Sequence, residues 1–163
     1  MAVANKRQLR SLRVGMPKDY IWNGKEVKSG IGKTEIQEVL LTKEGFIGDG
    51  VANPEFHGGP ERAVCLYPFE HYEKWEKEFS ATLKMPAFGE NITVSGMCEN
   101  EVYIGDIYKL EEAVIQVSQG RIPCSTISKH NGIEQLMKRV VETGFTGYFF
   151  RVLKEGMLIK NQR

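Results

Sequence analysis

Residues 113–124, AVIQVSQGRIPC, carry the pattern that decides the fold class of this chain. Apolar Ala, Ile and Val occupy every second position of 113–118, which predicts a β-strand with one buried face. Pro123 restricts the backbone just before Cys124, so the thiol leaves the end of the strand in a constrained direction. The segment therefore predicts a strand that presents a cysteine at its end.

Further short segments with strand-like composition lie on both sides of this stretch, separated by glycine-containing turns. They are 8–16, 35–41, 63–67, 91–95, 102–104, 107–110, 148–153 and 157–159. Only 69–79 and 133–143 show the spacing of amphipathic helices, and His71 is predicted on the exposed side of the first. Many short strands with two helices predict a mainly β fold, a β-barrel decorated with a few helices, in a single domain over 1–163.

Cys124 is the residue of the quoted stretch to which chemistry can most readily be assigned. Arg121 lies three residues upstream, and a guanidinium near a thiol favours the thiolate, which is both the nucleophile and the metal-binding form. A free cysteine is also often a small buried hydrophobe, and the local sequence leaves both interpretations open. Cys65 lies in an apolar run and is predicted to belong to the core, whereas Cys98 is assigned no role.

A paired-glycine segment precedes the strand predicted over 63–67. His57, Gly58 and Gly59 are followed closely by Arg62. Paired glycines let backbone N–H groups approach an anion, and Arg62 could add a bidentate contact to a phosphate. His57 could donate a hydrogen bond or shuttle a proton. The alternative interpretation is a tight turn that leads into the strand.

Two other segments contribute candidate contacts. Gly30, Gly32 and Lys33 lack the spacing of a phosphate loop, which leaves Lys33 either as a cation at the mouth of a site or as a surface lysine. Asn91, in 88–91 (FGEN), could contact polar edges of a ligand or shape a turn. Two Ile-Gly-Asp triplets, 47–49 and 104–106, are predicted to be turns at strand ends.

Composition argues against several classes of protein. The 22 basic and 21 acidic residues give a net charge of +1, without the basic excess of a dedicated nucleic-acid binder. No apolar stretch approaches the ~20 residues needed to span a bilayer, and residues 1–13 lack the apolar core of a signal peptide. We therefore expect a cytoplasmic protein that binds neither nucleic acid nor membranes. The three cysteines have no zinc-site spacing.

Taken in order, these segments resemble the MOSC family, the domain named after the C-terminal region of molybdenum-cofactor sulfurase, and within it the YiiM-like branch. The resemblance extends from about Leu9 to Leu158. It is carried by 30–33 (GIGK), 48–49 (GD), 57–59 (HGG), 62–64 (RAV), Tyr67, Trp75, 88–91 (FGEN), 104–106 (IGD), 117–119 (VSQ), 121–124 (RIPC), 147–148 (GY) and 151–153 (RVL).

The resemblance implies a MOSC-type β-barrel that binds the molybdenum cofactor, a pyranopterin ending in a phosphate. Cys124 is then the expected molybdenum ligand or sulfur carrier, with Lys33 and Arg62 as further catalytic residues. The expected cofactor contacts are Lys33, His57, Gly58, Gly59, Arg62, Asn91, Ser118, Gln119 and Arg121. Pyridoxal phosphate, with which the family domain is also associated, is not expected, because no lysine here has a Schiff-base context. Gly120 stands where the family motif usually has proline.

The resemblance further implies an oxidoreductase that reduces N-hydroxylated bases or related compounds, in line with the association of YiiM-like proteins with resistance to N-hydroxylated purines. Electrons would come from a separate donor protein, because the sequence has no flavin, haem or iron–sulfur signature. We expect a monomer or a homodimer. Two alternatives stay open: a carrier of cofactor or of sulfur, as a Cys124 persulfide, and a redox sensor that uses Cys124 without a cofactor.

Overall fold

A seven-stranded sheet forms the centre of the computed structural model, which describes residues 7–22, 24–50 and 59–160. In spatial order its strands are β4 (Thr34–Glu35), β1 (Gln8–Val14), β8 (Ile92–Ser95), β7 (Val64–Pro68), β11 (Tyr148–Lys154), β10 (Ala113–Gly120) and β9 (Ile107–Leu110). Neighbouring strands are antiparallel except β7 and β8, which are parallel. The alternation in 113–118 is realised in β10, where the predicted apolar face is buried.

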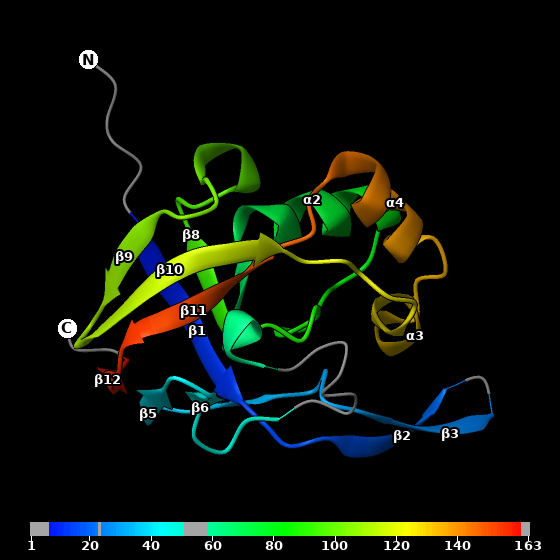
Figure 1. Ribbon diagram of the computed structural model, residues 1–163. Coiled ribbons are helices and arrows are strands. Elements are labelled where there is room, and N and C mark those ends of the chain that lie inside the picture. Colours follow the sequence, from blue (N-terminus) through cyan, green and yellow to red (C-terminus); the bar gives the residue numbers. More distant parts are fainter. Residues whose placement is uncertain (1–6, 23, 51–58, 161–163) are drawn as a thin grey trace.

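This sheet curls into a half-barrel, and a smaller sheet lies against its open side (Figure 1). The smaller sheet contains β12 (Gly156–Ile159), β5 (Glu38–Thr42) and β6 (Gly45–Phe46). Apolar side chains from both sheets, among them Leu12, Leu41 and Phe150, form the larger hydrophobic core. The predicted fold class, a mainly β MOSC-type barrel with a few helices, is confirmed.

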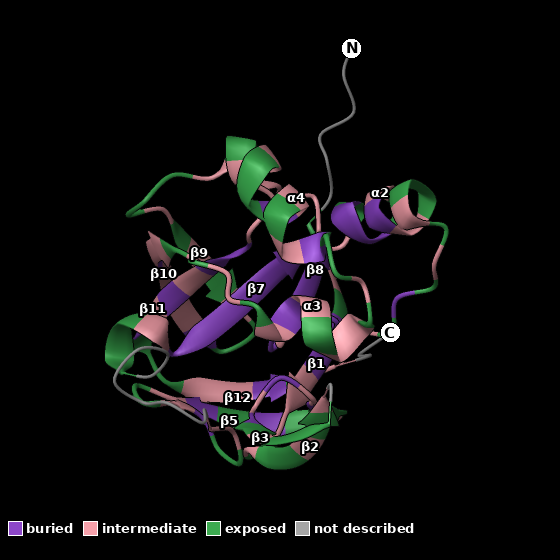
Figure 2. Cartoon of the chain, turned by 90° about the vertical axis from the view of Figure 1, so that its right-hand side faces the viewer, coloured by how far each residue is buried: buried purple, intermediate pink, exposed green. Residues whose placement is uncertain are grey.

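Three helices lie together at one side of the large sheet (Figure 1). They are α2 (Glu70–Phe79), α3 (Thr126–Asn131) and α4 (Leu136–Thr143). They cover a second core around Trp75, which is fully buried and donates a hydrogen bond of 2.8 Å to the Tyr67 hydroxyl. Every residue of β7 is buried, because one face of this strand meets the barrel core and the other meets the helix side (Figure 2). None of the described helices is long and apolar enough to cross a membrane.

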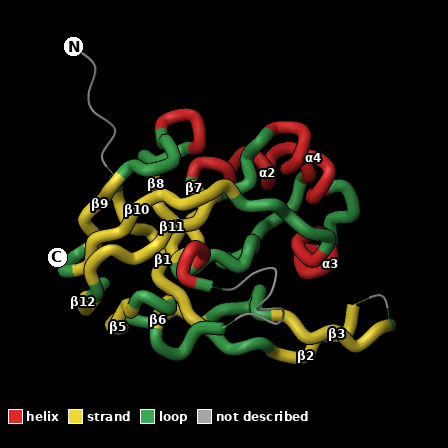
Figure 3. The backbone as a smooth tube through the Cα atoms, viewed as in Figure 1, coloured by secondary structure: helices red, strands yellow, loops and turns green. Residues whose placement is uncertain are grey.

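A two-stranded hairpin extends below α3 (Figure 3). Its strands are β2 (Lys18–Trp22) and β3 (Lys25–Ser29). The rings of Tyr20 and Trp22 stack at 4.8 Å, and both meet the ring of His130 edge-on. Burial lowers the pKa of His130. The aromatic contact therefore attaches the hairpin to the end of α3.

Several local predictions were wrong. Residues 102–104 form no strand, and the segment 35–41 is divided between β4 and β5. The second helix begins at Leu136, three residues later than predicted, and α3 and the hairpin were missed. His71, predicted on the exposed side of α2, is buried. These errors share one cause, because the burial of a short segment depends on contacts that are distant in sequence.

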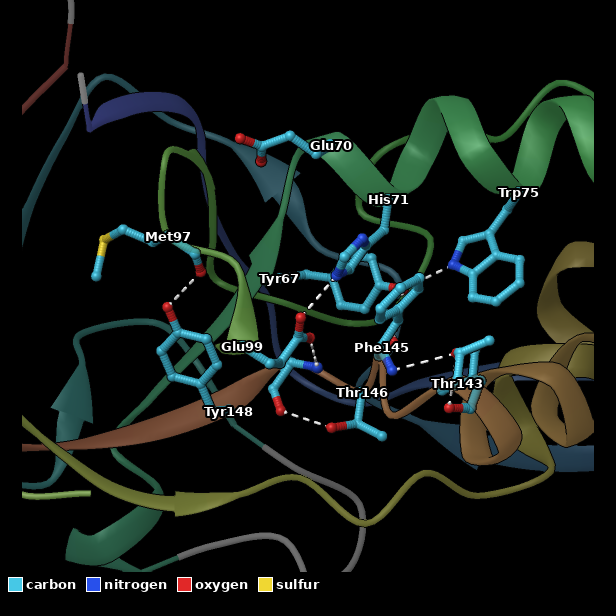
Figure 4. Close-up of polar contacts among 12 residues, drawn as sticks. Tyr67, Glu70, His71, Trp75, Met97, Glu99, Thr143, Phe145, Thr146 and Tyr148 are labelled. Carbon is cyan, nitrogen blue, oxygen red and sulfur yellow. Dashed lines mark hydrogen bonds and ion pairs between the residues drawn. The ribbon is translucent and has the colours of Figure 1, made fainter. Parts of the chain in front are cut away.

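His71 belongs to a polar cluster between α2, the 3₁₀ helix η2 (Glu99–Glu101) and the start of β11 (Figure 4). Its Nε2 atom lies 2.7 Å from Glu99 Oε1, and its ring stacks on Phe145 at 4.1 Å. Glu99 Oε2 accepts a hydrogen bond of 2.8 Å from the backbone N–H of Gly147. The carbonyl of Gly147 in turn accepts the backbone N–H of Arg121 at 3.2 Å. The cluster therefore holds β11 against the loop that follows β10.

Gly147→Ala is expected to destabilise the protein by about 3 kcal/mol, because two penalties combine. Gly147 has a φ of +79°, and an added Cβ would lie 2.6 Å from the carbonyl oxygen of Leu66. Gly132→Ala is the matched control, since Gly132 has a φ of +66° but no atom within 4 Å of an added Cβ. Its expected cost is about 1 kcal/mol. Thermal unfolding of both variants tests this, and equal losses would contradict the crowding at Gly147.

Candidate functional site

A cavity of about 210 Å³ opens on the helix side of the large sheet. The end of the hairpin, the loop before β8, the start of α3 and strands β7 and β11 all contribute to its wall. The lining residues are Lys28, Ser29, Gly30, Ile31, Lys33, Asp49, Arg62, Cys65, Gly89, Asn91, Arg121, Cys124, Thr126 and Phe149. Four of them are basic and one is acidic, so the described lining has a formal charge of +3.

Cys124 lines this cavity from the connection between β10 and α3. Strand β10 ends at Gly120, and the chain then runs without regular structure until α3 begins at Thr126. The carbonyl of Cys124 accepts the backbone N–H of Ile127 at 3.3 Å, which ties the cysteine to the first turn of α3. Its side chain is partly exposed, so a thiol in this position is accessible from the cavity.

Arg121 is held from two sides. Its backbone N–H donates to Gly147, and its guanidinium Nη1 donates to the carbonyl of Phe88 in the loop before β8. That contact occupies one part of the guanidinium fork, which has five N–H donors in total. Arg121 therefore connects two walls of the cavity, and it remains one of the basic residues that line it.

Arg62 is positioned by the short 3₁₀ helix η1 (Pro60–Arg62). The hydroxyl of Ser118 donates a hydrogen bond to the carbonyl of Glu61, and Arg151 forms an ion pair with the Glu61 carboxylate. The Arg151 guanidinium lowers the pKa of the Glu61 carboxyl. Two contacts from β10 and β11 thus fix η1, and with it the placement of Arg62 at the cavity.

Lys33 and Asn91 meet at a common partner, Asp49. The Lys33 Nζ atom lies 2.8 Å from Asp49 Oδ1, and Asn91 Nδ2 donates to Asp49 Oδ2 at 2.9 Å. The Asn91 side-chain oxygen accepts the backbone N–H of Cys65 at 2.9 Å. Lys33 and Asn91 both line the cavity as predicted. Their polar groups already form hydrogen bonds within the protein.

The other predicted cofactor contacts are not among the described residues that line the cavity. His57 and Gly58 lie outside the described residues. Gly59 is described, precedes η1 with a φ of +101° and does not belong to the described lining of the cavity. Ser118 and Gln119 lie on β10 and are also absent from that lining, although Ser118 supports η1.

Three lining residues were not predicted as part of a site. Asp49 was interpreted as a turn residue, Cys65 as core, and Phe149 only as part of a strand. Cys65 and Phe149 are paired neighbours on β7 and β11, so they form one patch of the cavity wall. Strand pairing across 84 positions brings them together, and no local pattern could have indicated it. For Asp49 the Gly48-Asp49 pair was a usable signal, because it belongs to the family resemblance.

The three thiols differ in their surroundings. Burial and the carboxylates of Glu70, Glu99 and Glu101 raise the pKa of Cys98 to about 12. Burial also raises the pKa of Cys65, although the charge of Arg121 partly offsets this effect. Within the described ranges, no three His, Cys, Asp or Glu side chains are placed so that they could hold a metal ion together.

Iodoacetamide at pH 8 is expected to label Cys124 and to leave Cys98 almost unmodified. A raised pKa means a smaller thiolate fraction at a given pH, and with a pKa of about 12 roughly one Cys98 thiol in ten thousand is ionised at pH 8. Peptide mass spectrometry against time measures each site, and unfolded protein, in which all three cysteines should react, is the control. Comparable rates at Cys98 and Cys124 would contradict the prediction.

Comparison with known proteins places this architecture in a family. The family model of the MOSC domain matches residues 53–162. An uncharacterised protein YflK of Bacillus subtilis is 48% identical over 147 residues, which are 90% of this chain and 66% of YflK. A protein of Gibberella moniliformis named "Reductase" is 36% identical, with 84% of this chain and 25% of that protein covered. The chain thus spans less than two thirds of the length of these curated relatives.

The crystal structure of YiiM from Geobacillus stearothermophilus superposes on the present fold with a TM-score of 0.76. It shares 35% sequence identity, and the match covers 94% of this chain and 71% of that one. The match to the family model extends over most of the described barrel and includes the segment from Arg62 to Cys124. On these grounds the chain belongs to the MOSC domain family, in its YiiM-like branch.

Proposed function

We propose that this protein binds the molybdenum cofactor in the cavity beside Cys124 and reduces N-hydroxylated bases or related compounds. One observation carries the proposal: an accessible cysteine lies in a small cavity whose described lining has a charge of +3. Membership of the MOSC family and the reductase name of one relative support the same class of chemistry.

The donor set of the cavity fits such a cofactor. A thiolate is a soft ligand suited to a soft metal site, and Cys124 would provide it. Arginine guanidinium groups bind phosphate oxygens in bidentate fashion, so Arg62 and Arg121 would hold the anionic end of the cofactor. His57 and Gly58 are proposed as further contacts from the paired-glycine segment that precedes η1.

The side chains of the cavity would each have a limited task. A bound molybdenum centre supplies two-electron redox chemistry. The net conversion of a hydroxylamino group to an amine and water needs two electrons and two protons. The electrons would come from a separate donor protein, whereas Arg62 and Arg121 would hold anionic groups. Phe149 and Ile31 provide apolar surface in the cavity wall that would exclude water from one side of a bound ligand.

The test is to express the protein in a host that makes the cofactor and to measure molybdenum and pterin per chain. Reduction of an N-hydroxylated purine is then assayed with a chemically reduced viologen as the electron donor. Near-stoichiometric molybdenum together with turnover would support the proposal. Protein that holds neither molybdenum nor pterin would contradict it.

The same preparation distinguishes the two alternatives. A sulfur carrier would release cyanide-labile sulfur from Cys124 and show no reductase activity. A redox sensor would contain no metal and would show reversible oxidation of Cys124 by peroxide.

A further inference from the structure

Asp49 contributes a negative charge to a cavity whose other charged residues, in the described lining, are basic. It is the one acidic residue in the described part of that lining. It lies just after a turn at Gly48, whose φ is +88°. A carboxylate in this place opposes the binding of an anion, so Asp49 must have a role in the cavity other than contact with an anionic ligand.

The ion pair of Asp49 with Lys33 is nearly enclosed. The side chains of Lys33 and Asp49 are 4% and 14% exposed, and Nζ and Oδ1 are 2.8 Å apart. In such surroundings each charge is stabilised mainly by the other, and removing one partner leaves an uncompensated charge. The positive charge of Lys33 is therefore cancelled locally, and this lysine attracts an approaching anion far less than its position suggests.

The same carboxylate also accepts hydrogen bonds from one backbone group and one side chain. Oδ1 accepts the backbone N–H of Gly15 at 3.0 Å, and Oδ2 accepts Asn91 Nδ2 at 2.9 Å. The orientation of the Asn91 amide then directs its oxygen toward the backbone N–H of Cys65, in the cavity wall. Three segments that are distant in sequence are thus joined at one carboxylate.

We propose that Asp49 is the positioning residue of this cavity: it neutralises Lys33 and orients Asn91. The attraction for an anion then comes from the other basic residues of the described lining, Lys28, Arg62 and Arg121. This inference rests on the proposed function only in treating the cavity beside Cys124 as an anion site. It reassigns Lys33 from a direct anion contact to a partner of Asp49.

Alkylation of Cys124 measures the charge of the cavity without any cofactor. Iodoacetate is anionic and iodoacetamide is neutral, and in both reactions the thiolate sulfur displaces iodide from carbon. Because each rate is proportional to the same thiolate fraction, the ratio of the two rates reports how strongly the cavity attracts an anion. Rates are measured at Cys124 by peptide mass spectrometry in the wild type and in Lys33→Met, Asp49→Asn and Lys33→Met/Asp49→Asn.

We expect the iodoacetate-to-iodoacetamide ratio to fall about fivefold in Lys33→Met and to rise about fivefold in Asp49→Asn, as one uncompensated unit charge in the lining of the cavity would cause. In the double variant the ratio should stay within about twofold of the wild type. The double variant decides even where Lys33→Met folds poorly, because it leaves neither charge unpaired. A ratio that falls as far in the double variant as in Lys33→Met would overturn the proposal, because Lys33 would then act on the anion directly.

Asp106→Asn is the matched control. Asp106 ends a second Ile-Gly-Asp triplet, with the φ of Gly105 at +96°, and its carboxylate accepts the backbone N–H of Tyr103 outside the cavity. This variant changes the net charge equally and should leave the ratio unchanged; a rise equal to that of Asp49→Asn would overturn the proposal. Because no cofactor is needed, a failure to find molybdenum would count against the proposed function alone.

Discussion

Cys124→Ser protein from a host that makes the molybdenum cofactor is expected to contain at most about a tenth of the wild-type molybdenum. Losing a supporting residue around a metal ligand already costs about tenfold to a hundredfold in affinity, and here the ligand itself is replaced. A serine hydroxyl keeps the size of the side chain, but it is a hard donor that is not ionised near neutral pH. The measurement is molybdenum per chain by elemental analysis.

The pterin content of the same protein separates two roles within the cavity. If Arg62 and Arg121 hold the phosphate end, Cys124→Ser should lose molybdenum more completely than pterin, whereas Arg121→Met should lose both in parallel. Cys98→Ser is the control, because Cys98 lies outside the cavity lining and should leave both contents unchanged. Full molybdenum in Cys124→Ser would mean that the thiol is not the ligand, and the proposed function would lose its principal residue.

The strands with the clearest patterns were predicted well. Strand β10 has strict alternation, and β9 and β11 have predicted and observed bounds that agree within one residue. Their side chains alternate between the core and the outer face, so local sequence contains the necessary information. The hairpin of β2 and β3 was missed because its exposed surface carries mixed polar residues, and its aromatic rings pack on α3 rather than on the barrel core.

The cavity could be predicted only in part. Arg121 and Cys124 are close in sequence, so a local motif was enough to join them. Arg62, Lys33 and Asn91 also line the cavity, and the family resemblance selected them because their order along the chain is characteristic. No sequence pattern indicated that the charge of Lys33 is balanced by Asp49, because this ion pair depends on where two loops lie in space.

The Phe88-Gly89-Glu90-Asn91 segment shows how the buried side of the fold supports this cavity. Glu90 is fully buried, and each of its oxygens accepts hydrogen bonds from inside the protein. Oε2 accepts the hydroxyls of Tyr72 at 2.6 Å and Thr93 at 2.8 Å, while Oε1 accepts the backbone N–H of Phe88 at 3.1 Å. Burial and this nearby carboxylate raise the pKa of Tyr72, so the phenol stays a donor. The carboxylate therefore fixes the loop that contributes Gly89 and Asn91 to the cavity.

Glu90→Gln is expected to destabilise the protein by about 3 kcal/mol, which for a domain of this size lowers the melting temperature by about 6–12 °C. Glutamine has the same shape, but it replaces one acceptor oxygen with an NH₂ group, which must then face a hydrogen donated by Tyr72, Thr93 or Phe88. Glu112→Gln is the control, because Glu112 is exposed and its one hydrogen bond among the described residues is a long contact of 3.4 Å from the backbone N–H of Met157. Its change in stability should stay within about 0.5 kcal/mol. Thermal unfolding followed by circular dichroism measures both variants. Equal melting temperatures for Glu90→Gln and wild type would show that the buried donors can be satisfied without the carboxylate, and the loop would then need another source of its order.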